Sequence, residues 1–277
     1  MTLPTDYDSF RVDPLTPQFG AEVAGLDLGD IDDASLATLH DAWMDWKVLF
    51  FRDQDISIEQ HIDFGRRLGE LEVHPFLADP DHPELVVLDT AGAGPAKANF
   101  WHTDVSFRER PPMGSILRGR IIPTTGGDTC WIDMERLYDD LDDELKELID
   151  GRTATHTLSK TFGKMVDADE RERKLAEFPD QHHPVVRTHP VTGRKCLYLN
   201  RPFVQCIDGM EHEESRRLLR QLVGPANYSI LEQQIRFRWR PNSFAMWDNR
   251  CTQHYAIADY DDRRRVERVT LAGDVPV

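Results

Sequence analysis

Long apolar runs are absent from this 277-residue sequence, and positive charge is scarce. No uninterrupted apolar stretch approaches the roughly 20 residues that a membrane-spanning helix needs, so we expect no transmembrane segment. Lys and Arg number 33 against 49 Asp and Glu, which gives a formal net charge of −16. Because nucleic acids and anionic membranes are polyanions, this charge argues against both as partners. A small anionic substrate is still compatible with it, since a few arginines can reverse the charge inside one pocket.

Cysteine is also scarce, and its four positions show no Cys-x-x-Cys spacing. They are Cys130, Cys196, Cys206 and Cys251. Structural zinc sites and disulfide frameworks both need more regular spacing, so we expect all four to be buried free thiols. The first 15 residues are acidic and lack the basic and apolar regions of a signal peptide. We therefore expect a cytoplasmic protein.

The distribution of hydrophobic residues predicts a single domain, residues 1–277, that is mainly β. Hydrophobic residues make up 40% of the chain, and no long low-complexity linker divides it. Short apolar runs bounded by Gly, Pro, Asp or Asn are typical of strands, and they do not alternate regularly with helices. This pattern favours a β-sandwich or jelly roll with helices on its outside. The polar segment 158–183 is expected to be a surface excursion or lid. The predicted strands cover 47–51, 84–89, 114–122, 127–133, 183–189, 195–200, 234–240, 243–248 and 264–273.

Four further segments carry apolar residues at helical spacing. In the first, a stripe of Leu and Trp follows Asp33 or Ser35 as the N-cap. Ser57 and Gln60 have the spacing of a capping box at the start of the second. The third is predicted to be one continuous helix that ends at Gly151. The four segments are 32–46, 57–71, 134–151 and 211–224.

His-x-Asp/Glu pairs occur at four places, and only one lies in a strand-like, aromatic-rich run. The pairs are His61–Asp63, His82–Glu84, His102–Asp104 and His212–Glu214. Residues two apart on a helix diverge by about 200°, which excludes the first and last pairs as joint ligands of one ion. The second pair lies in a Pro-rich turn. In the extended run FWHTDVSF, His102 and Asp104 would point to the same face. The alternative is a surface His–Asp hydrogen bond.

A second histidine, about 150 residues later, can complete this pair. His254 follows an apolar strand and an Asp-Asn turn in SFAMWDNRCTQHY, and a jelly roll brings distant strands together. Two histidines and one carboxylate form the facial triad of non-haem Fe(II) oxygenases, which leaves coordination positions open for a co-substrate and O2. Zinc hydrolases use the same ligand types, so the triad alone does not fix the reaction.

The run DDRRRVERVTLAGD places Arg264 and Arg268 on one face of a strand and Arg263 and Arg265 on the other. Two inward guanidinium groups in so acidic a protein would form a pocket for carboxylates or sulfonates. The alternative is an exposed strand whose arginines pair with nearby carboxylates.

Five blocks of sequence together resemble the taurine dioxygenase family. They are NFWHTDVSF, TTGGDTCW, HPVVRTHPVTG, WDNRCTQHYAIADY and RVTLAGD, and the resemblance runs from about residue 10 to the C-terminus. Members of this family are Fe(II)- and 2-oxoglutarate-dependent oxygenases. The resemblance therefore implies a double-stranded β-helix (a cupin-like jelly roll), a dioxygenase that uses Fe(II), 2-oxoglutarate and O2, and a homo-oligomer.

The matching positions imply roles for individual residues. His102, Asp104 and His254 correspond to the iron ligands. Thr129 and Arg264 correspond to the residues that hold the distal carboxylate of 2-oxoglutarate. The positions that match the primary-substrate pocket are His74, Val105, Phe162, Phe203 and Arg268, of which His74 and Arg268 contact the anionic group.

Three departures from the family pattern concern the co-substrate and the substrate. Counting forward from His254 would select Arg265 for 2-oxoglutarate, whereas counting back from RVTLAGD selects Arg264. We favour the latter, which keeps the same-face spacing with the second inward arginine. An Asn of the taurine-specific members is Ala98 here, and a Tyr is Leu77. Both changes remove polar contacts and argue against taurine itself.

The functional hypothesis is the hydroxylation of a small anionic substrate. The first choice is a sulfonate or sulfate ester, which would release sulfite or sulfate and an aldehyde. One alternative is the same iron chemistry on an amino acid or a natural-product intermediate. An alternative of another class is a non-catalytic metal-binding jelly roll, which would have no need of a co-substrate clamp.

Overall fold

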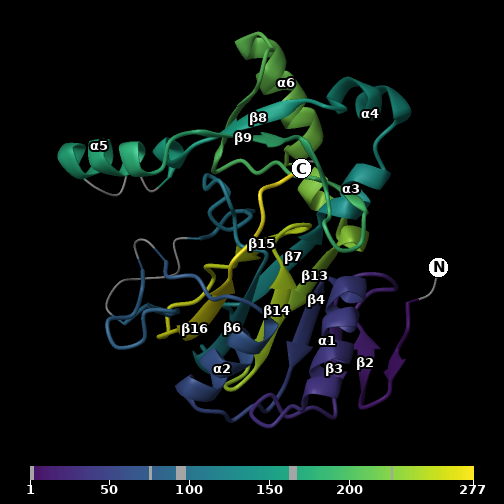
Figure 1. The fold of residues 1–277 in the computed structure, drawn as a ribbon, viewed down its shortest axis with the longest axis vertical. Helices are drawn as coiled ribbons and strands as arrows, with labels where there is room; N and C mark the ends of the chain where they lie inside the picture. Colours follow the sequence, from purple (N-terminus) through teal and green to yellow (C-terminus); the bar gives the residue numbers. More distant parts are fainter. Residues whose placement is uncertain (1–2, 75–76, 92–97, 162–166, 226) are drawn as a thin grey trace.

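The computed structural model describes residues 3–74, 77–91, 98–161, 167–225 and 227–277. Its largest element is an eight-stranded sheet with the order β1-β2-β3-β4-β14-β6-β16-β5 (Figure 1). All pairs in this sheet are antiparallel except β3 with β4. The strands are β1 Asp6–Tyr7, β2 Phe10–Pro14, β3 Ala21–Ala24, β4 Val48–Phe51, β5 Leu85–Asp89, β6 Gly114–Ile121, β14 Phe244–Asp248 and β16 Arg265–Leu271.

A three-stranded antiparallel sheet, β13-β7-β15, packs against the large one. Two smaller sheets, β12-β8-β9 and β10-β11, complete the strands of the described residues. Their bounds are β7 Thr129–Asp133, β8 Thr153–His156, β9 Gln181–Pro184, β10 Val186–Thr188, β11 Lys195–Leu197, β12 Val204–Ile207, β13 Gln234–Phe237 and β15 Thr252–Ala256.

Aromatic side chains fill the space between the two facing sheets. Phe50 of β4 stacks on Phe237 of β13 with ring centroids 4.1 Å apart. Trp131 of β7 meets Trp247 of β14 edge-on at 5.8 Å, and all four rings are buried. Such pairs favour offset or edge-to-face geometry and bury large apolar areas. Two sheets closed over one core, with helices outside, confirm the predicted jelly roll.

The helices lie outside this sandwich (Figure 1). They are α1 Asp33–Trp46, α2 Ile58–Leu68, α3 Met134–Asp139, α4 Asp143–Ile149, α5 Ala168–Glu177 and α6 His212–Val223, with 3-10 turns at Leu158–Lys160, Asn227–Ser229 and Leu231–Gln233. The predicted stripe of α1 is buried against the large sheet. Its N-cap is Asp32, one residue before the predicted Asp33, because the Asp32 carboxylate accepts from Ser35 N–H at 2.7 Å.

None of the described helices combines the length and the apolarity needed to cross a bilayer.

The segment 134–151 was predicted as one helix, and this prediction is wrong. It forms α3 and α4, each with its own aspartate N-cap. Asp133 accepts hydrogen bonds from the start of α3, and Asp142 accepts one from Leu145 N–H at 2.8 Å. Aspartate stabilises helix starts better than helix interiors, so α3 ends at Asp139 and Asp142 begins a new helix.

The predicted capping box of α2 is present. Ser57 Oγ accepts from Gln60 N–H at 3.1 Å, and the Gln60 side chain accepts from Ser57 N–H at 2.9 Å. We expect Ser57→Ala to lower the free energy of unfolding by about 1 kcal/mol, measured by urea denaturation. Ser9→Ala, in an exposed turn, is the control. An unchanged urea midpoint for Ser57→Ala would show that the box does not stabilise the protein.

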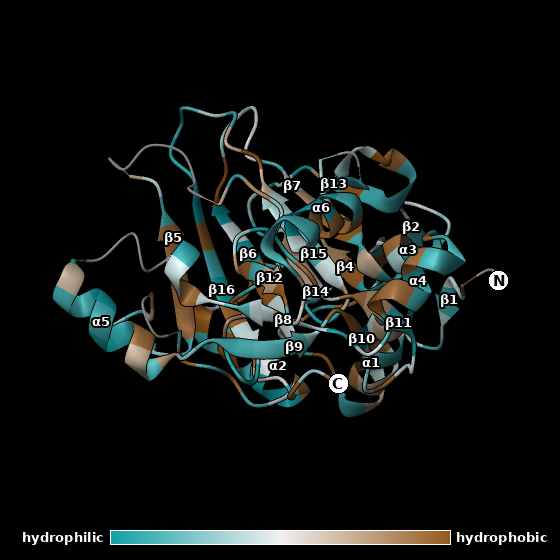
Figure 2. Cartoon of the chain, turned by 90° about the horizontal axis from the view of Figure 1, so that it is seen from above, coloured by the Kyte–Doolittle hydropathy of each residue, from teal (hydrophilic) through white to brown (hydrophobic). Residues whose placement is uncertain are grey.

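The charged segment predicted as an excursion contains α5, which has no buried residue and projects from the body in both views (Figures 1 and 2). On its inner side, Leu175 and Phe178 pack against a small buried cluster that includes Val105 and Phe203. The prediction extended too far, because residues 181–184 form β9 and pair with β8.

Candidate active site

Three side chains from distant parts of the chain meet at one point. The Nε2 atoms of His102 and His254 each lie 4.0 Å from Asp104 Oδ1. One ligand atom from each residue lies within 4.8 Å of the others, and all three residues are buried. The two imidazole rings have centroids 4.1 Å apart. The structure therefore brings together the residues of the predicted triad.

The local backbone differs from the predicted strand. His102 forms only an isolated β-bridge, in which its N–H donates to His254 O at 3.1 Å and His254 N–H donates back at 2.9 Å. Asp104 begins a turn, and Val105 has a φ of 37°. The two side chains converge through this turn and not through strand alternation.

Protonation favours metal binding at these residues. Nδ1 of His102 lies 2.9 Å from the Phe100 carbonyl oxygen. A hydrogen on Nδ1 leaves the Nε2 lone pair directed at Asp104. Burial lowers the pKa of both His102 and His254, which keeps them in the neutral form that binds metals. Burial alone would raise the pKa of Asp104, but the charge of Arg268 lowers it overall, so the carboxylate is ionised.

Arg268 contacts the carboxylate of this triad directly. Its Nη1 donates to Asp104 Oδ1 at 3.0 Å and to Oδ2 at 2.9 Å. Its Nε is buried and has no hydrogen-bond partner among the described residues. His74 is buried nearby, and burial together with the Arg268 charge lowers its pKa to about 4. His74 is therefore neutral at pH 7, and it lies near the Arg268 guanidinium, whose Nε is an available donor.

Two residues of this region were missed by sequence reasoning. Glu72 and Arg108 form an ion pair with a 2.5 Å separation between Oε2 and Nη1. Burial raises the pKa of Glu72 to about 7, against the opposing effect of Arg108. The charges of this pair act on His74 and Arg268 as well. The only sequence signal for Glu72 is its position two residues before His74, and no such signal marks Arg108.

The predicted 2-oxoglutarate residues form a second cluster. Thr129 Oγ1 accepts a hydrogen bond from Trp239 Nε1 at 2.9 Å. The Arg264 guanidinium lies 5.9 Å from the centre of the Trp239 ring, and its Nε donates to the Gly127 carbonyl at 3.1 Å. Arg264 is 5% exposed and forms no salt bridge with any described residue. Arg265, in contrast, is partly exposed and pairs with Glu267 at 3.2 Å. Trp239 was not identified from the sequence.

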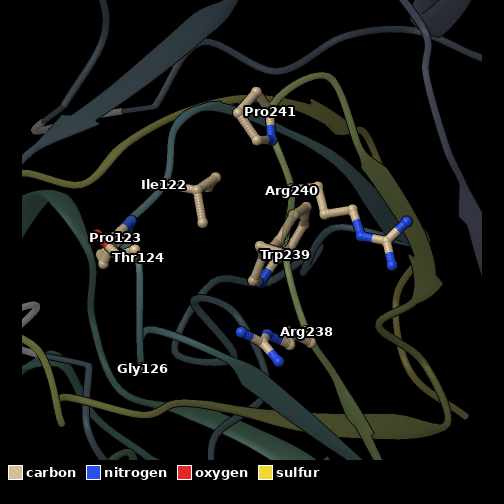
Figure 3. A pocket seen from close by; sticks show the side chains of 8 residues that line it. All are labelled: Ile122, Pro123, Thr124, Gly126, Arg238, Trp239, Arg240 and Pro241. Carbon is tan, nitrogen blue, oxygen red and sulfur yellow. The ribbon is translucent and has the colours of Figure 1, made fainter.

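Trp239 also lines a cavity of about 450 Å³ (Figure 3). Its walls come from the loop after β6, including Ile122 and Thr124, and from the residues after β13, including Arg238 and Pro241. No triad residue lines it. The cavity therefore borders the Thr129 and Arg264 cluster through Trp239.

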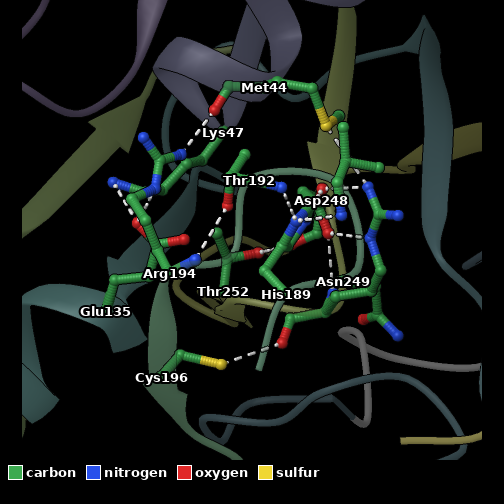
Figure 4. A network of polar contacts seen from close by, with 12 residues as sticks. Met44, Lys47, Glu135, His189, Thr192, Arg194, Cys196, Asp248, Asn249 and Thr252 are labelled. Atoms are coloured by element: carbon green, nitrogen blue, oxygen red, sulfur yellow. Dashed lines mark hydrogen bonds and ion pairs between the residues drawn. The ribbon is translucent and has the colours of Figure 1, made fainter. Parts of the chain in front are cut away.

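A second group of potential ligands, His189, Asp248 and Cys251, is a structural network. Figure 4 shows His189 and Asp248 within it. Arg250 donates to both oxygens of Asp248, through Nε at 2.9 Å and Nη2 at 2.6 Å, and His189 Nε2 lies 3.0 Å away. Burial raises the pKa of Cys251 well above its usual value, so its thiol stays protonated. With Asp248 saturated by these partners, we assign no metal here. All four cysteines are free thiols, as predicted, but only Cys196 and Cys251 are buried, whereas Cys130 and Cys206 are partly exposed.

The remaining predicted pocket positions are spread around the triad. Val105 and Phe203 are buried in one cluster with Phe107, which lies beneath α5. Phe162 lies outside the described residues. Ala98 is half-buried, and its carbonyl accepts a hydrogen bond from Ala256 N–H at 3.3 Å. Leu77 is 40% exposed.

Comparison with known proteins decides the family. The profile of the family described as taurine catabolism dioxygenase TauD, TfdA family matches residues 11–270. The chain belongs to this family. It is therefore a 2-oxoglutarate-dependent dioxygenase, and the recognition drawn from the five sequence blocks is confirmed.

Curated relatives of this TauD/TfdA-family protein cover nearly its whole length. An alpha-ketoglutarate-dependent sulfate ester dioxygenase of Pseudomonas putida is 39% identical over 96% of this chain and 90% of its own length. An alkylsulfatase of Acinetobacter baylyi is 37% identical over 94% and 84%. Among solved structures, a taurine dioxygenase from Burkholderia xenovorans superposes with a TM-score of 0.83 at 36% identity, covering 97% and 91%. AAD-2 in complex with Mn(II) and N-oxalylglycine gives 0.83 at 32%, covering 96% and 98%.

Proposed function

We propose that this TauD/TfdA-family protein hydroxylates small sulfate esters or alkylsulfonates with Fe(II), 2-oxoglutarate and O2. One observation carries the proposal: two buried arginines accompany the buried triad, one for each of two anionic ligands. Arg264 lies beside Thr129 without a salt-bridge partner among the described residues, and Arg268 lies against Asp104 with a free Nε. A buried guanidinium without a countercharge is unfavourable unless an anion binds it, and Arg264 is such a group. Arg268 already pairs with Asp104, but its buried Nε can donate to a second anion. One arginine for the co-substrate and one for the substrate fit a reaction that needs two anions.

The triad fits ferrous iron as its metal. His102 and His254 would each offer Nε2, and Asp104 an oxygen, which is the two-histidine, one-carboxylate set typical of non-haem Fe(II). When bound, the iron supplies the activation of O2 that oxidises 2-oxoglutarate and then a substrate C–H bond. The buried surroundings exclude water from the reacting groups.

Arg264 and Thr129 would hold the distal carboxylate of 2-oxoglutarate. The planar guanidinium matches a carboxylate through paired hydrogen bonds, and Thr129 Oγ1 can donate its own hydrogen because it accepts from Trp239. The burial that lowers the Arg264 pKa also strengthens such a pair. A structure similar to this chain was solved with Mn(II) and N-oxalylglycine, which carries the same two carboxylates as 2-oxoglutarate.

Arg268 and His74 would bind the sulfate or sulfonate of the primary substrate. Their grip fixes which carbon lies nearest the iron, and this positioning selects the bond that reacts. With a sulfate ester, one oxygen atom of O2 enters succinate, and the other forms a hydroxyl on the carbon that bears the ester oxygen. That carbon then becomes an aldehyde as the C–O bond to sulfate breaks, so the products are aldehyde, sulfate, succinate and CO2. The sulfate ester dioxygenase and alkylsulfatase among the relatives support this class.

A substrate panel tests the proposal. We expect medium-chain alkyl sulfates or alkylsulfonates to drive succinate formation, and taurine to give a kcat/KM at least about tenfold lower. One lost hydrogen bond in a pocket accounts for a factor of this size. Ala98 and Leu77 replace the polar residues of the taurine-specific members. The panel also includes phenoxyalkanoates and amino acids, because one relative, 32% identical, is a phenoxypropionate dioxygenase. Succinate formation with those compounds alone would contradict the proposed sulfate-ester and sulfonate substrates.

Binding without turnover distinguishes the enzyme from a non-catalytic module. Under anaerobic conditions, the apoprotein with Fe(II) and 2-oxoglutarate should develop a weak visible charge-transfer band that neither component gives alone. Glutarate, which lacks the keto oxygen, is the matched control and should give no band. A protein that binds Fe(II) but shows no band with 2-oxoglutarate would contradict the proposed co-substrate site.

A further inference from the structure

Asn249 lies in the turn between β14 and β15 and holds the main chain of Asp104. Its Oδ1 accepts a hydrogen bond from Asp104 N–H at 2.9 Å, and its Nδ2 donates to the Asp104 carbonyl at 3.4 Å. The same Nδ2 donates to the Pro112 carbonyl at 3.0 Å. Asn249 is 1% exposed. One carboxamide therefore fixes both main-chain polar groups of Asp104, from the segment that also carries His254.

The main chain after Asp104 is strained. Val105 has a φ of 37°, which β-branched residues rarely adopt. Such a conformation persists only where its surroundings over-determine it. On the far side of Val105, Ser106 Oγ lies 2.9 Å from His156 Nδ1 and accepts from Asn200 Nδ2 at 2.8 Å. The strained residue is thus held on both of its flanks.

The turn that carries Asn249 is itself fixed by buried groups (Figure 4). The carboxylate of Asp248 pairs with Arg250 at 2.6 Å and with His189 at 3.0 Å. The hydroxyl of Thr252 donates to the Asp248 carbonyl at 2.6 Å. All of these residues are buried. Asn249 therefore reaches the adjacent turn from a rigid support.

We propose that Asn249 is a positioning residue for the metal site, which sets the place of the Asp104 carboxylate relative to His254. The inference rests on the proposed role of the triad as metal ligands. Ligands must be held within about 0.5 Å of their productive positions. Without Asn249, the strain at Val105 can relax, and Arg268, which already contacts both carboxylate oxygens, can draw the carboxylate away from the histidines.

Metal affinity of the apoprotein tests this inference. We expect Asn249→Ala to weaken Mn(II) binding to the purified full chain by about 10- to 100-fold in titration calorimetry, the range typical of lost supporting contacts at metal sites. The visible spectrum of bound Co(II) should shift as well, because its coordination changes. The matched control is Thr103→Val, which removes another hydrogen bond between the same segments, from Thr103 Oγ1 to Thr252 O at 3.2 Å. Its Mn(II) affinity should stay within about twofold of wild type.

The outcomes are separable. If the wild-type chain binds no Mn(II), the triad assignment itself fails. If the wild type binds and Asn249→Ala binds equally well, with only a lower melting temperature, Asn249 is structural and the positioning role is wrong. Should Asn249→Ala not fold, Asn249→Asp keeps the volume and the acceptor for Asp104 N–H. We expect weaker Mn(II) binding there too, although an added negative charge by itself attracts a cation. Tighter or unchanged binding in that variant would also overturn the role.

Discussion

Asp104→Ala is expected to form succinate at less than about one thousandth of the wild-type rate, because two histidines alone cannot hold the metal that the chemistry needs. The replacement also leaves the Arg268 guanidinium buried without its carboxylate partner. Asp104→Asn keeps the side-chain volume and one oxygen for Arg268, but a neutral amide is a much weaker ligand. We therefore expect it to lose turnover to a similar extent while folding normally. Succinate formation and Mn(II) titration are the two measurements.

The second group of potential ligands provides the matched control for this prediction. Cys251→Ser alters the group formed with His189 and Asp248, and we expect it to keep wild-type Mn(II) stoichiometry and turnover. Near-normal succinate formation by Asp104→Asn would exclude the triad as the metal site. Loss of metal in Cys251→Ser together with retention in Asp104→Asn would move the site to the second group.

The second large effect is a separation of roles between the two inward arginines. Arg264→Leu should raise the KM for 2-oxoglutarate on the order of 100-fold, because losing one partner of a buried ion pair weakens binding by about 2–5 kcal/mol. Its KM for the primary substrate should change far less. Arg268→Leu should do the reverse. It should also lower kcat through its contact with Asp104, so the ratio of the two KM values is the measurement that separates the arginines.

The outward arginines of the same run are the controls. Arg263 is largely exposed and pairs with Asp89 at 2.6 Å, and Arg265 pairs with Glu267. Alanine at either position should leave both KM values within about twofold of wild type, because both guanidinium groups are already paired with carboxylates of the protein. If Arg265→Ala raised the KM for 2-oxoglutarate and Arg264→Leu did not, Arg265 would be the residue that holds 2-oxoglutarate, as counting forward from His254 predicts.

Much of the fold and of the site could be predicted from the sequence, and the failures have local causes. The strands with strong apolar runs were found, including β4, β14 and β16. The short or polar strands β1, β2, β3, β8, β12 and β15 were missed, and β9 was only partly covered by the predicted strand 183–189, because pairing partners and not their own residues determine these strands. The break at Asp142 was missed because apolar periodicity continues across it. A cap inside a periodic segment overrides that periodicity.

At the site, motif spacing identified residues but not the contacts among them. His102 and Asp104 meet His254 through a turn with positive φ at Val105, whereas alternation along a strand was the predicted route. Asn249 and Trp239 form hydrogen bonds to residues that are remote in sequence. Such contacts depend on the closed sandwich, so no local pattern could indicate them.

The position in the sequence of His254 and of the strands next to β6 has a consequence for biosynthesis. Both strands that flank β6, namely β14 and β16, come from the last 35 residues of the chain. A nascent polypeptide released only as far as residue 240 holds two of the three proposed ligands and a sheet with a gap in its middle. Assembly of the triad must therefore wait until His254 and β16 have been synthesised, and folding must close contacts over more than 100 residues, which slows it. Chains truncated at residue 240 should consequently bind no metal at this site.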